Sequence, residues 1–91
     1  MSHILIKHAH TLPRAEAKTL AQNVADKMKE EFSFEYNWQG DTLNFKRSGV
    51  QGTISVTDTE VAVEAKLGLL LSALKPKVES EINRFLKENF G

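Results

Sequence analysis

Apolar and polar residues alternate at every second position through the middle of the chain, between residues 32 and 67. This is the repeat of a β-strand, in which successive side chains point to opposite faces of a sheet. The apolar positions that would share one face are Phe32, Phe34, Tyr36, Trp38, Leu43, Phe45, Val50, Gly52, Ile54, Val56, Val61, Val63, Ala65 and Leu67. The turns at 39–41, 48–49 and 57–59 are short enough only for hairpins, since parallel neighbours need a long crossover. The pattern predicts an antiparallel meander with one apolar and one polar face.

Two features of this meander concern its aromatic residues. Gly52 lies inside a strand, which indicates a bulge or a place where another backbone or a large ring comes close, and Trp38 is one candidate for that ring. Aromatic side chains along neighbouring strands can also form a stacking platform for bases. Because Phe34, Tyr36, Trp38 and Phe45 lie opposite a polar face, we interpret them as core residues.

The segments before the meander predict a strand and a helix. Ile4 and Ile6 alternate with polar or mixed positions, as in a strand with those two residues in the core. Pro13 suits a first helical turn, so we expect a helix to begin there, with Thr11 or Leu12 near its cap. The residues that recur at three- and four-residue steps along it are Ala17, Leu20, Ala21, Val24, Ala25 and Met28.

The segment after the meander returns to helical spacing. Its apolar stripe consists of Leu71, Leu74, Val78, Ile82, Phe85 and Leu86. Pro76 leaves two alternatives. It occupies the first turn of a helix capped by Ser72, or it kinks a helix that begins near Gly68. The whole chain, residues 1–91, is therefore predicted to be a single α+β domain of order β-α-β-β-β-β-α, with an antiparallel sheet and two helices packed on one face.

Composition limits the classes of function. Twelve Lys and Arg balance twelve Asp and Glu, so the basic face expected of a nucleic-acid-binding protein is not indicated. The chain has no cysteine, which excludes disulfides, thiolate metal sites and a cysteine nucleophile. It also lacks an apolar run of membrane-spanning length and the apolar core of a secretion signal. We therefore expect a cytoplasmic protein without a membrane span.

Candidate chemical groups are few. His8 and His10 lie on the same side of an extended segment, where they would bind a metal only with a third ligand, and His3 has the wrong parity to join them. Packing at the strand end is the favoured interpretation. Glu35 and Glu64 are read, together with Glu30 and Glu31, as solvated surface charges, with Lys46 or Lys66 as cross-strand partners. We assign no catalytic, cofactor-binding or metal-binding residue and expect a protein that is not an enzyme.

The C-terminal segment offers a candidate interaction surface. Its apolar residues exceed what one sheet face needs, so Leu69, Leu70 or Phe90 could be exposed to a partner or an apolar surface. Core packing is the favoured interpretation of these residues. Two other modes of interaction stay open: a homodimer formed by pairing of the end strands, and a ligand groove between the sheet and the C-terminal helix.

Several short motifs together resemble the putative polyhydroxyalkanoic acid system protein family over nearly the whole chain. They are His10-Thr11-Leu12, Ala17, Trp38-Gln39-Gly40-Asp41, Leu43-Asn44-Phe45, Gly49-Val50-Gln51-Gly52-Thr53-Ile54 and Leu67-Gly68. Members of that family are small bacterial proteins encoded in polyhydroxyalkanoate gene regions. The resemblance implies a cytoplasmic role connected with storage granules, and it implies no catalytic residues.

The resulting functional hypothesis is a non-enzymatic accessory or granule-associated protein of polyhydroxyalkanoate storage. Its expected partners are a polyhydroxyalkanoate granule, a granule-associated protein or a second copy of the chain. The alternative is a small binding protein that holds a hydroxyacyl or fatty-acyl ligand between the sheet and the C-terminal helix.

Overall fold

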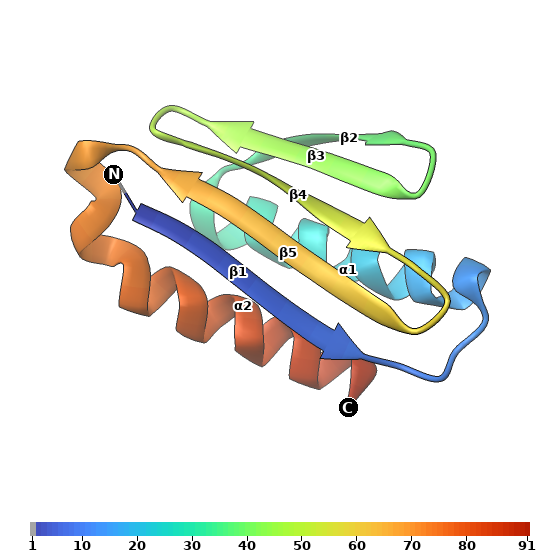
Figure 1. Ribbon diagram of the computed structural model, residues 1–91. Helices are drawn as coiled ribbons and strands as arrows, with labels where there is room; N and C mark the ends of the chain where they lie inside the picture. Colours follow the sequence, from blue (N-terminus) through green and yellow to red (C-terminus); the bar gives the residue numbers. More distant parts are fainter. Residues whose placement is uncertain (1) are drawn as a thin grey trace.

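A computed structural model describes residues 2–91 and contains one five-stranded antiparallel sheet with helices on one face (Figure 1). The elements are β1 (Ser2–Ala9), α1 (Arg14–Phe32), β2 (Glu35–Gln39), β3 (Thr42–Arg47), β4 (Val50–Val56), β5 (Glu60–Leu67), the 3-10 helix η1 (Leu69–Leu74) and α2 (Lys75–Phe90). The strand order is β1-β5-β4-β3-β2. The predicted α+β class and element order are confirmed.

The core lies between the sheet and the two long helices. Its buried apolar side chains alternate along the strands, as the period of two requires. From α1 it receives Ala17, Ala21, Val24, Ala25 and Met28, and from α2 it receives Val78, Ile82, Phe85 and Leu86. Three of the five buried residues of α1 are alanines, whereas α2 packs through larger side chains. The other sheet face has no helix over it (Figure 1).

The predicted close approach of a backbone or a large ring at Gly52 is confirmed, but the ring is that of Phe45 and not that of Trp38. Gly52 pairs directly with Phe45 across β3 and β4, and the ladder runs through it without a bulge. A Cβ atom at Gly52 would lie 2.7 Å from Phe45 Cζ and 2.2 Å from the carbonyl oxygen of Glu64. Trp38 lies at the margin of the core, only half-buried, where its indole Nε1 donates to Gln22 Oε1 at 2.6 Å. The glycine is needed because an added Cβ atom would clash with the backbone of β5 and with the Phe45 ring.

The helix starts differ slightly from those expected. Pro13, in extended conformation, is the N-cap residue of α1, and Arg14 is the first helical residue. At the other helix, helical backbone begins directly after Gly68 as η1 and becomes α-helical at Lys75, with Pro76 in the first turn. The Ser72 hydroxyl donates to the Gly68 carbonyl at 3.1 Å and caps no α-helix. Each sequence alternative was therefore correct in one part.

Candidate interaction surface

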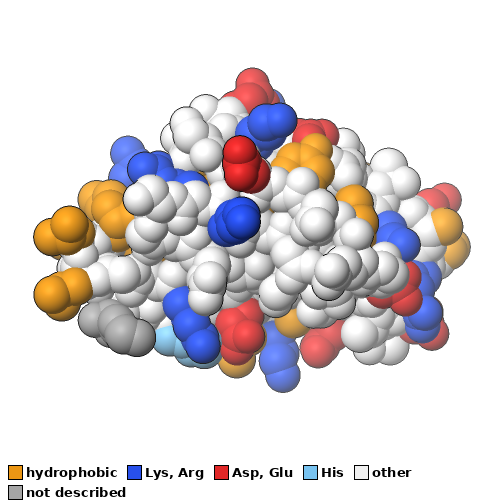
Figure 2. All heavy atoms as spheres, turned by 90° about the horizontal axis from the view of Figure 1, so that it is seen from above, with side chains coloured by type: hydrophobic (Ala, Val, Ile, Leu, Met, Phe, Trp, Pro, Cys, Tyr) orange, Lys and Arg blue, Asp and Glu red, His pale blue; other side chains and the backbone are white. Residues whose placement is uncertain are grey.

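The most exposed apolar side chains belong to η1, where Leu69, Leu70 and Leu74 form a group that we term the leucine cap. Their exposed fractions are 78%, 92% and 47%. Core packing, the favoured sequence interpretation of Leu69 and Leu70, is therefore wrong, as is the place of Leu74 in the buried stripe. Figure 2 shows hydrophobic side chains gathered at this end of the molecule, with Lys and Arg side chains beside them.

Contacts with the β3–β4 hairpin hold η1 in place. The Gly68 N–H donates to the Gly49 carbonyl at 2.7 Å, and the Leu71 N–H donates to the Gly68 carbonyl at 3.0 Å. Gly49 has a φ of +87°, and a Cβ atom there would lie 2.9 Å from Leu71 Cδ1. Leu71 thus packs over a bare glycine and against the core. Because Leu71 takes the inward position of this tight turn, its neighbouring leucines point outward.

Positive charge borders the leucine cap. Residues 67–74 carry no ionisable side chain, and Lys66 and Lys75 stand at their two ends. Lys75 and Lys77 lie in the first turn of α2, which contains no acidic residue. A helix N-terminus already bears partial positive charge, so cations there do not favour the helix itself. They do favour contact with a negatively charged surface.

Phe90 lies at the opposite end of α2 from the leucine cap. Its ring is half-buried and lies 6.0 Å from the ring of His8 and 5.9 Å from that of His10, centroid to centroid. The 16 residues of α2 separate this end from η1 by about 24 Å at 1.5 Å per residue. The residues singled out in the sequence therefore belong to two places, and only Leu69 and Leu70 lie together.

The two histidines beside Phe90 are used in packing and hydrogen bonding. The Leu12 N–H donates to His10 Nδ1 at 3.1 Å, so Nε2 carries the proton that is donated to the Thr57 carbonyl at 2.8 Å. His10 is accordingly a neutral, buried residue that ties the end of β1 to the β4–β5 turn. Within residues 2–91, no group of three or more His, Asp and Glu side chains could hold a metal ion.

A carboxylate meets the histidine that the sequence analysis set aside. His3 Nε2 lies 3.1 Å from Glu64 Oε2, and both side chains are half-exposed, at 50% and 52%. This contact replaces the expected pairing of Glu64 with Lys66. A solvated pair of this kind contributes little to stability, and water screens it. Pairs that serve in acid–base catalysis are typically held in a buried site, and this pair is open to water.

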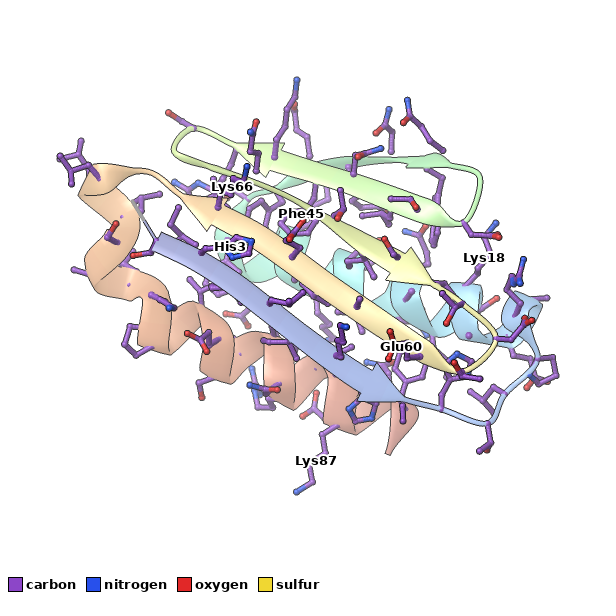
Figure 3. The ribbon with its side chains drawn as sticks, in the orientation of Figure 1. His3, Lys18, Phe45, Glu60, Lys66 and Lys87 are labelled. Carbon is purple, nitrogen blue, oxygen red and sulfur yellow. The ribbon has the colours of Figure 1, made fainter. Side chains whose placement is uncertain are left out.

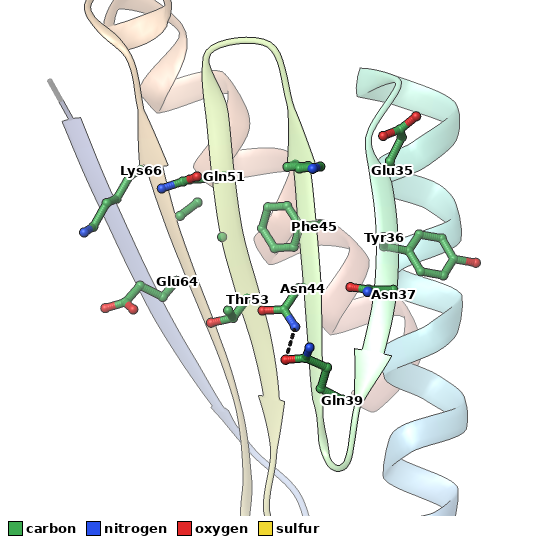
Figure 4. Close-up of a pocket in the computed structure, with 13 residues that line it drawn as sticks. Glu35, Tyr36, Asn37, Gln39, Asn44, Phe45, Gln51, Thr53, Glu64 and Lys66 are labelled. Atoms are coloured by element: carbon green, nitrogen blue, oxygen red, sulfur yellow. Dashed lines mark hydrogen bonds between the residues drawn. The ribbon is translucent and has the colours of Figure 1, made fainter.

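The open sheet face carries a hollow of ≈ 700 Å³ that spans β2 to β5 (Figure 4). Most of the residues that line it have polar side chains, and Phe45, Gly52 and Ala65 line it as well. The polar side chains that point to the open face are Glu35, Asn37, Gln39, Asn44, Lys46, Gln51, Thr53, Glu64 and Lys66. Asn44 Nδ2 donates to Gln39 Oε1 at 3.2 Å. The hollow lies on the face away from α2, whereas the space that an acyl ligand was expected to occupy is filled by the buried side chains of α2.

A polar network that the sequence did not reveal ties α1 to β2. The Tyr36 hydroxyl donates to Asp26, and Gln22 contacts both Tyr36 and Trp38. The hydrogen bond to Asp26 raises the pKa of Tyr36 above its ordinary value, and burial adds to the effect. The signal in the sequence is the four-residue spacing of Gln22 and Asp26, which puts both at one side of the helix.

Arg14 joins three segments at the far end of the sheet. Its guanidinium lies 2.9 Å from Asp41 and 3.0 Å from Asp58, in the β2–β3 and β4–β5 turns. Its hydrogen bond with Asp58 is the main cause that raises the pKa of Arg14 above its ordinary value. This charged cluster stabilises the turns and lies far along the strands from the leucine cap, so the two ends of the molecule differ in character.

The family model described as "Putative polyhydroxyalkanoic acid system protein" matches residues 4–90. The chain belongs to this family. The resemblance drawn from the sequence motifs is thereby confirmed. Among curated proteins and among solved structures, nothing matches the chain.

The match to the polyhydroxyalkanoic acid system protein family includes every helix and nearly all of the sheet. The leucine cap and the open-face hollow both lie inside it. The family description names a polymer system and no reaction. As for membranes, no helix within residues 2–91 is long and apolar enough to cross one.

Proposed function

We propose that the protein is a non-enzymatic accessory protein of polyhydroxyalkanoate storage that binds the apolar surface of storage granules through its leucine cap. The observation that carries the proposal is the exposure of Leu69 and Leu70, at 78% and 92%, on a turn held by the β3–β4 hairpin. Exposed leucines cost a protein solubility, so a cluster of them at one end marks a contact surface. The choice of polyhydroxyalkanoate as the polymer rests on family membership.

The energy available from the leucine cap fits a reversible contact. Full burial of one leucine contributes about 1.5–3 kcal/mol, so the three partly exposed side chains supply roughly 3–6 kcal/mol before the costs of association. Since −8.2 kcal/mol corresponds to a micromolar dissociation constant, one cap alone binds weakly. Lys66 and Lys77 add attraction if the granule surface is negatively charged, whereas the ammonium group of Lys75 lies 3.8 Å from the Glu79 carboxylate.

The non-enzymatic part of the proposal rests on the side chains that chemistry would need. His10 has both ring nitrogens in structural hydrogen bonds, and His8 packs on Phe90. The contact between His3 and Glu64 is open to water. General acid–base catalysis depends on groups positioned beside a reacting atom with tuned pKa values, and these histidines are committed elsewhere or solvated.

Co-sedimentation with isolated polyhydroxyalkanoate granules tests the surface. We expect the double variant Leu69→Ser, Leu70→Ser to bind at least ~10-fold more weakly, because about two leucine side chains lose their burial. The control is Ala15→Ser, which changes an exposed apolar side chain in the first turn of α1. The control should bind like the native chain. Equal loss in both variants, or native protein that stays in the supernatant, would contradict the proposal.

The charged border can be tested separately. Lys77→Gln removes a cation next to the leucine cap, and Lys87→Gln removes one from the last turn of α2, which points away from the sheet (Figure 3). We expect granule binding to fall with Lys77→Gln and to stay unchanged with Lys87→Gln. Raising the salt concentration should abolish the difference, because exposed charges are screened. A larger loss with Lys87→Gln would place the contact elsewhere on α2.

A further inference from the structure

The outer edge of β1 carries a row of backbone groups directed away from the sheet. The His10 N–H donates to the Thr59 carbonyl at 2.9 Å. In the same register, the backbone N–H and C=O groups of the even-numbered residues of β1 point toward β5. By the alternation of an antiparallel ladder, the N–H and C=O groups that point outward are those of His3, Leu5, Lys7 and Ala9. Within residues 2–91, no turn or side-chain hydrogen bond uses these groups.

The two edges of the sheet are not equivalent. β2 has five residues, and its Trp38 and Tyr36 side chains are tied to Gln22 of α1. β1 has eight residues, pairs with β5 along its whole length and contains neither proline nor a bulge. Leu5, at its centre, is 55% exposed. Native proteins protect edges by short strands, prolines, bulges or several charges, and on β1 only Lys7 offers such protection.

We propose that β1 pairs with β1 of a second copy, antiparallel and related by a two-fold axis, to form a continuous ten-stranded sheet. An isologous contact of this kind is self-complementary, because each strand presents the same donors and acceptors to the other. We infer the register in which Ile6 lies opposite Ile6 of the second copy. Leu5 then faces Lys7, and His3 faces Ala9, so every outward N–H and C=O group of β1 obtains a partner.

Charge and burial favour this register over the one centred on Leu5. Centring on Leu5 would put Lys7 opposite His3. In the proposed register, Lys7 of the second copy lies across Leu5 in the row that continues to Glu64, which pairs with Leu5 in β5. The lysine stem covers the exposed leucine, and its ammonium group points toward the carboxylate. The half-exposed Ile6 is covered as well.

The pairing has a geometric consequence for the leucine caps. Ser2 pairs with Leu67, so the start of β1 lies next to η1. In an antiparallel pair of β1 strands, the two caps therefore lie at opposite ends of the dimer. The dimer does not depend on the proposed granule contact, since the edge of β1 and the leucine cap share no residue.

Cysteine cross-linking tests the register, and the cysteine-free chain gives it no background. Ile6→Cys places two thiols at the two-fold axis in a non-hydrogen-bonded pair, where Cα atoms approach to about 4.5 Å. We expect rapid disulfide-linked dimer on mild oxidation. Thr53→Cys, at the centre of the open face, and Leu70→Cys, in the leucine cap, should link slowly. Faster linkage through Thr53→Cys or Leu70→Cys than through Ile6→Cys would overturn the proposal.

Sedimentation equilibrium of the full chain tests the edge itself. Leu5→Pro removes an N–H that makes no bond to β5, a position at which an edge strand accepts proline. We expect it to weaken the dimer at least ~10-fold, because two-fold symmetry removes two hydrogen bonds. Leu5→Ala keeps the N–H and should weaken it less. A native chain with the mass of one copy at every concentration would overturn the proposal, as would Leu5→Pro that is folded by circular dichroism and dimerises like native. If Leu5→Pro does not fold, the cross-linking experiment decides.

Discussion

η1 and α2 are consecutive and both rich in apolar residues, but η1 exposes leucines that α2 would bury. In α2, the buried residues Val78, Ile82, Phe85 and Leu86 are at most 6% exposed, whereas η1 buries none of its leucines. The α-helical repeat gathers residues three and four apart into one stripe that faces the sheet. A 3-10 turn has three residues per turn, so Leu69 and Leu70 cannot share the inward side with Leu71. Apolar composition alone does not make a core residue.

The largest expected effect is the difference in the free energy of unfolding between truncating a leucine of α2 and truncating one of η1. Leu86→Ala removes a fully buried side chain and should lower the free energy of unfolding by about 2–5 kcal/mol. Leu70→Ala removes one that is 92% exposed and should change it by less than about 0.5 kcal/mol. Urea unfolding followed by circular dichroism measures both. A cost above about 1 kcal/mol for Leu70→Ala would show that the leucine cap is packed in solution.

The next effect concerns the glycine that holds η1. Gly49 has a φ of +87°, and an added Cβ would displace Leu71; at Gly40, φ is +62° but no atom lies within 4 Å of an added Cβ. Gly40→Ala should therefore cost about 1–2 kcal/mol through backbone conformation alone. Gly49→Ala should cost roughly 2–3 kcal/mol, because displacement of Leu71 is added. Equal costs in thermal unfolding would show that Leu71 does not anchor η1.

The sequence predicted the architecture well because periodicity reports directly on which face is buried. Strands with Val61 and Val63 in the core, and a helix with Ile82 and Phe85 in one stripe, follow from the repeat alone. The prediction from the sequence failed where strand register determines which side chains are in contact. Whether Phe45 or Trp38 covers Gly52 depends on which residues face each other across β3 and β4, and no local pattern contains that information.

The candidate surface was predicted only in part, for a related reason. The surplus of apolar residues in the C-terminal segment pointed to Leu69, Leu70 and Phe90 as candidates. The 16 residues of α2 separate Phe90 from the other two. Leu74, which is 47% exposed, lies where 3-10 backbone changes to α-helical backbone at Lys75. Such a switch changes which residues share a face without changing the apolar pattern.

A smaller effect is expected at the far end of α2. Phe90 packs its ring beside His8 and His10 but is only half-buried. Phe90→Ala should cost about 1–2 kcal/mol, below the 3–5 kcal/mol typical of a fully buried phenylalanine. NMR spectra should show the imidazole signals of His8 and His10 shifting, because the ring current of Phe90 is lost. Granule binding should not change. Loss of binding with full stability would extend the contact surface to this end.

The smallest effect separates the charge at the two ends of α2. Lys77 lies in the first turn and Lys87 in the last. The positive end of the helix dipole disfavours Lys77, so Lys77→Gln should raise the free energy of unfolding by about 0.3–1 kcal/mol at low ionic strength. Lys87 meets the negative end, so Lys87→Gln should lower it by a similar amount. High salt should reduce the difference in the free energy of unfolding between the two variants.

If Lys77→Gln instead destabilised the protein, the lysine would have a structural partner, and its place beside the leucine cap would no longer point to an anionic surface. A stabilised variant that binds granules more weakly would separate the two roles, since the same cation then opposes folding and favours contact.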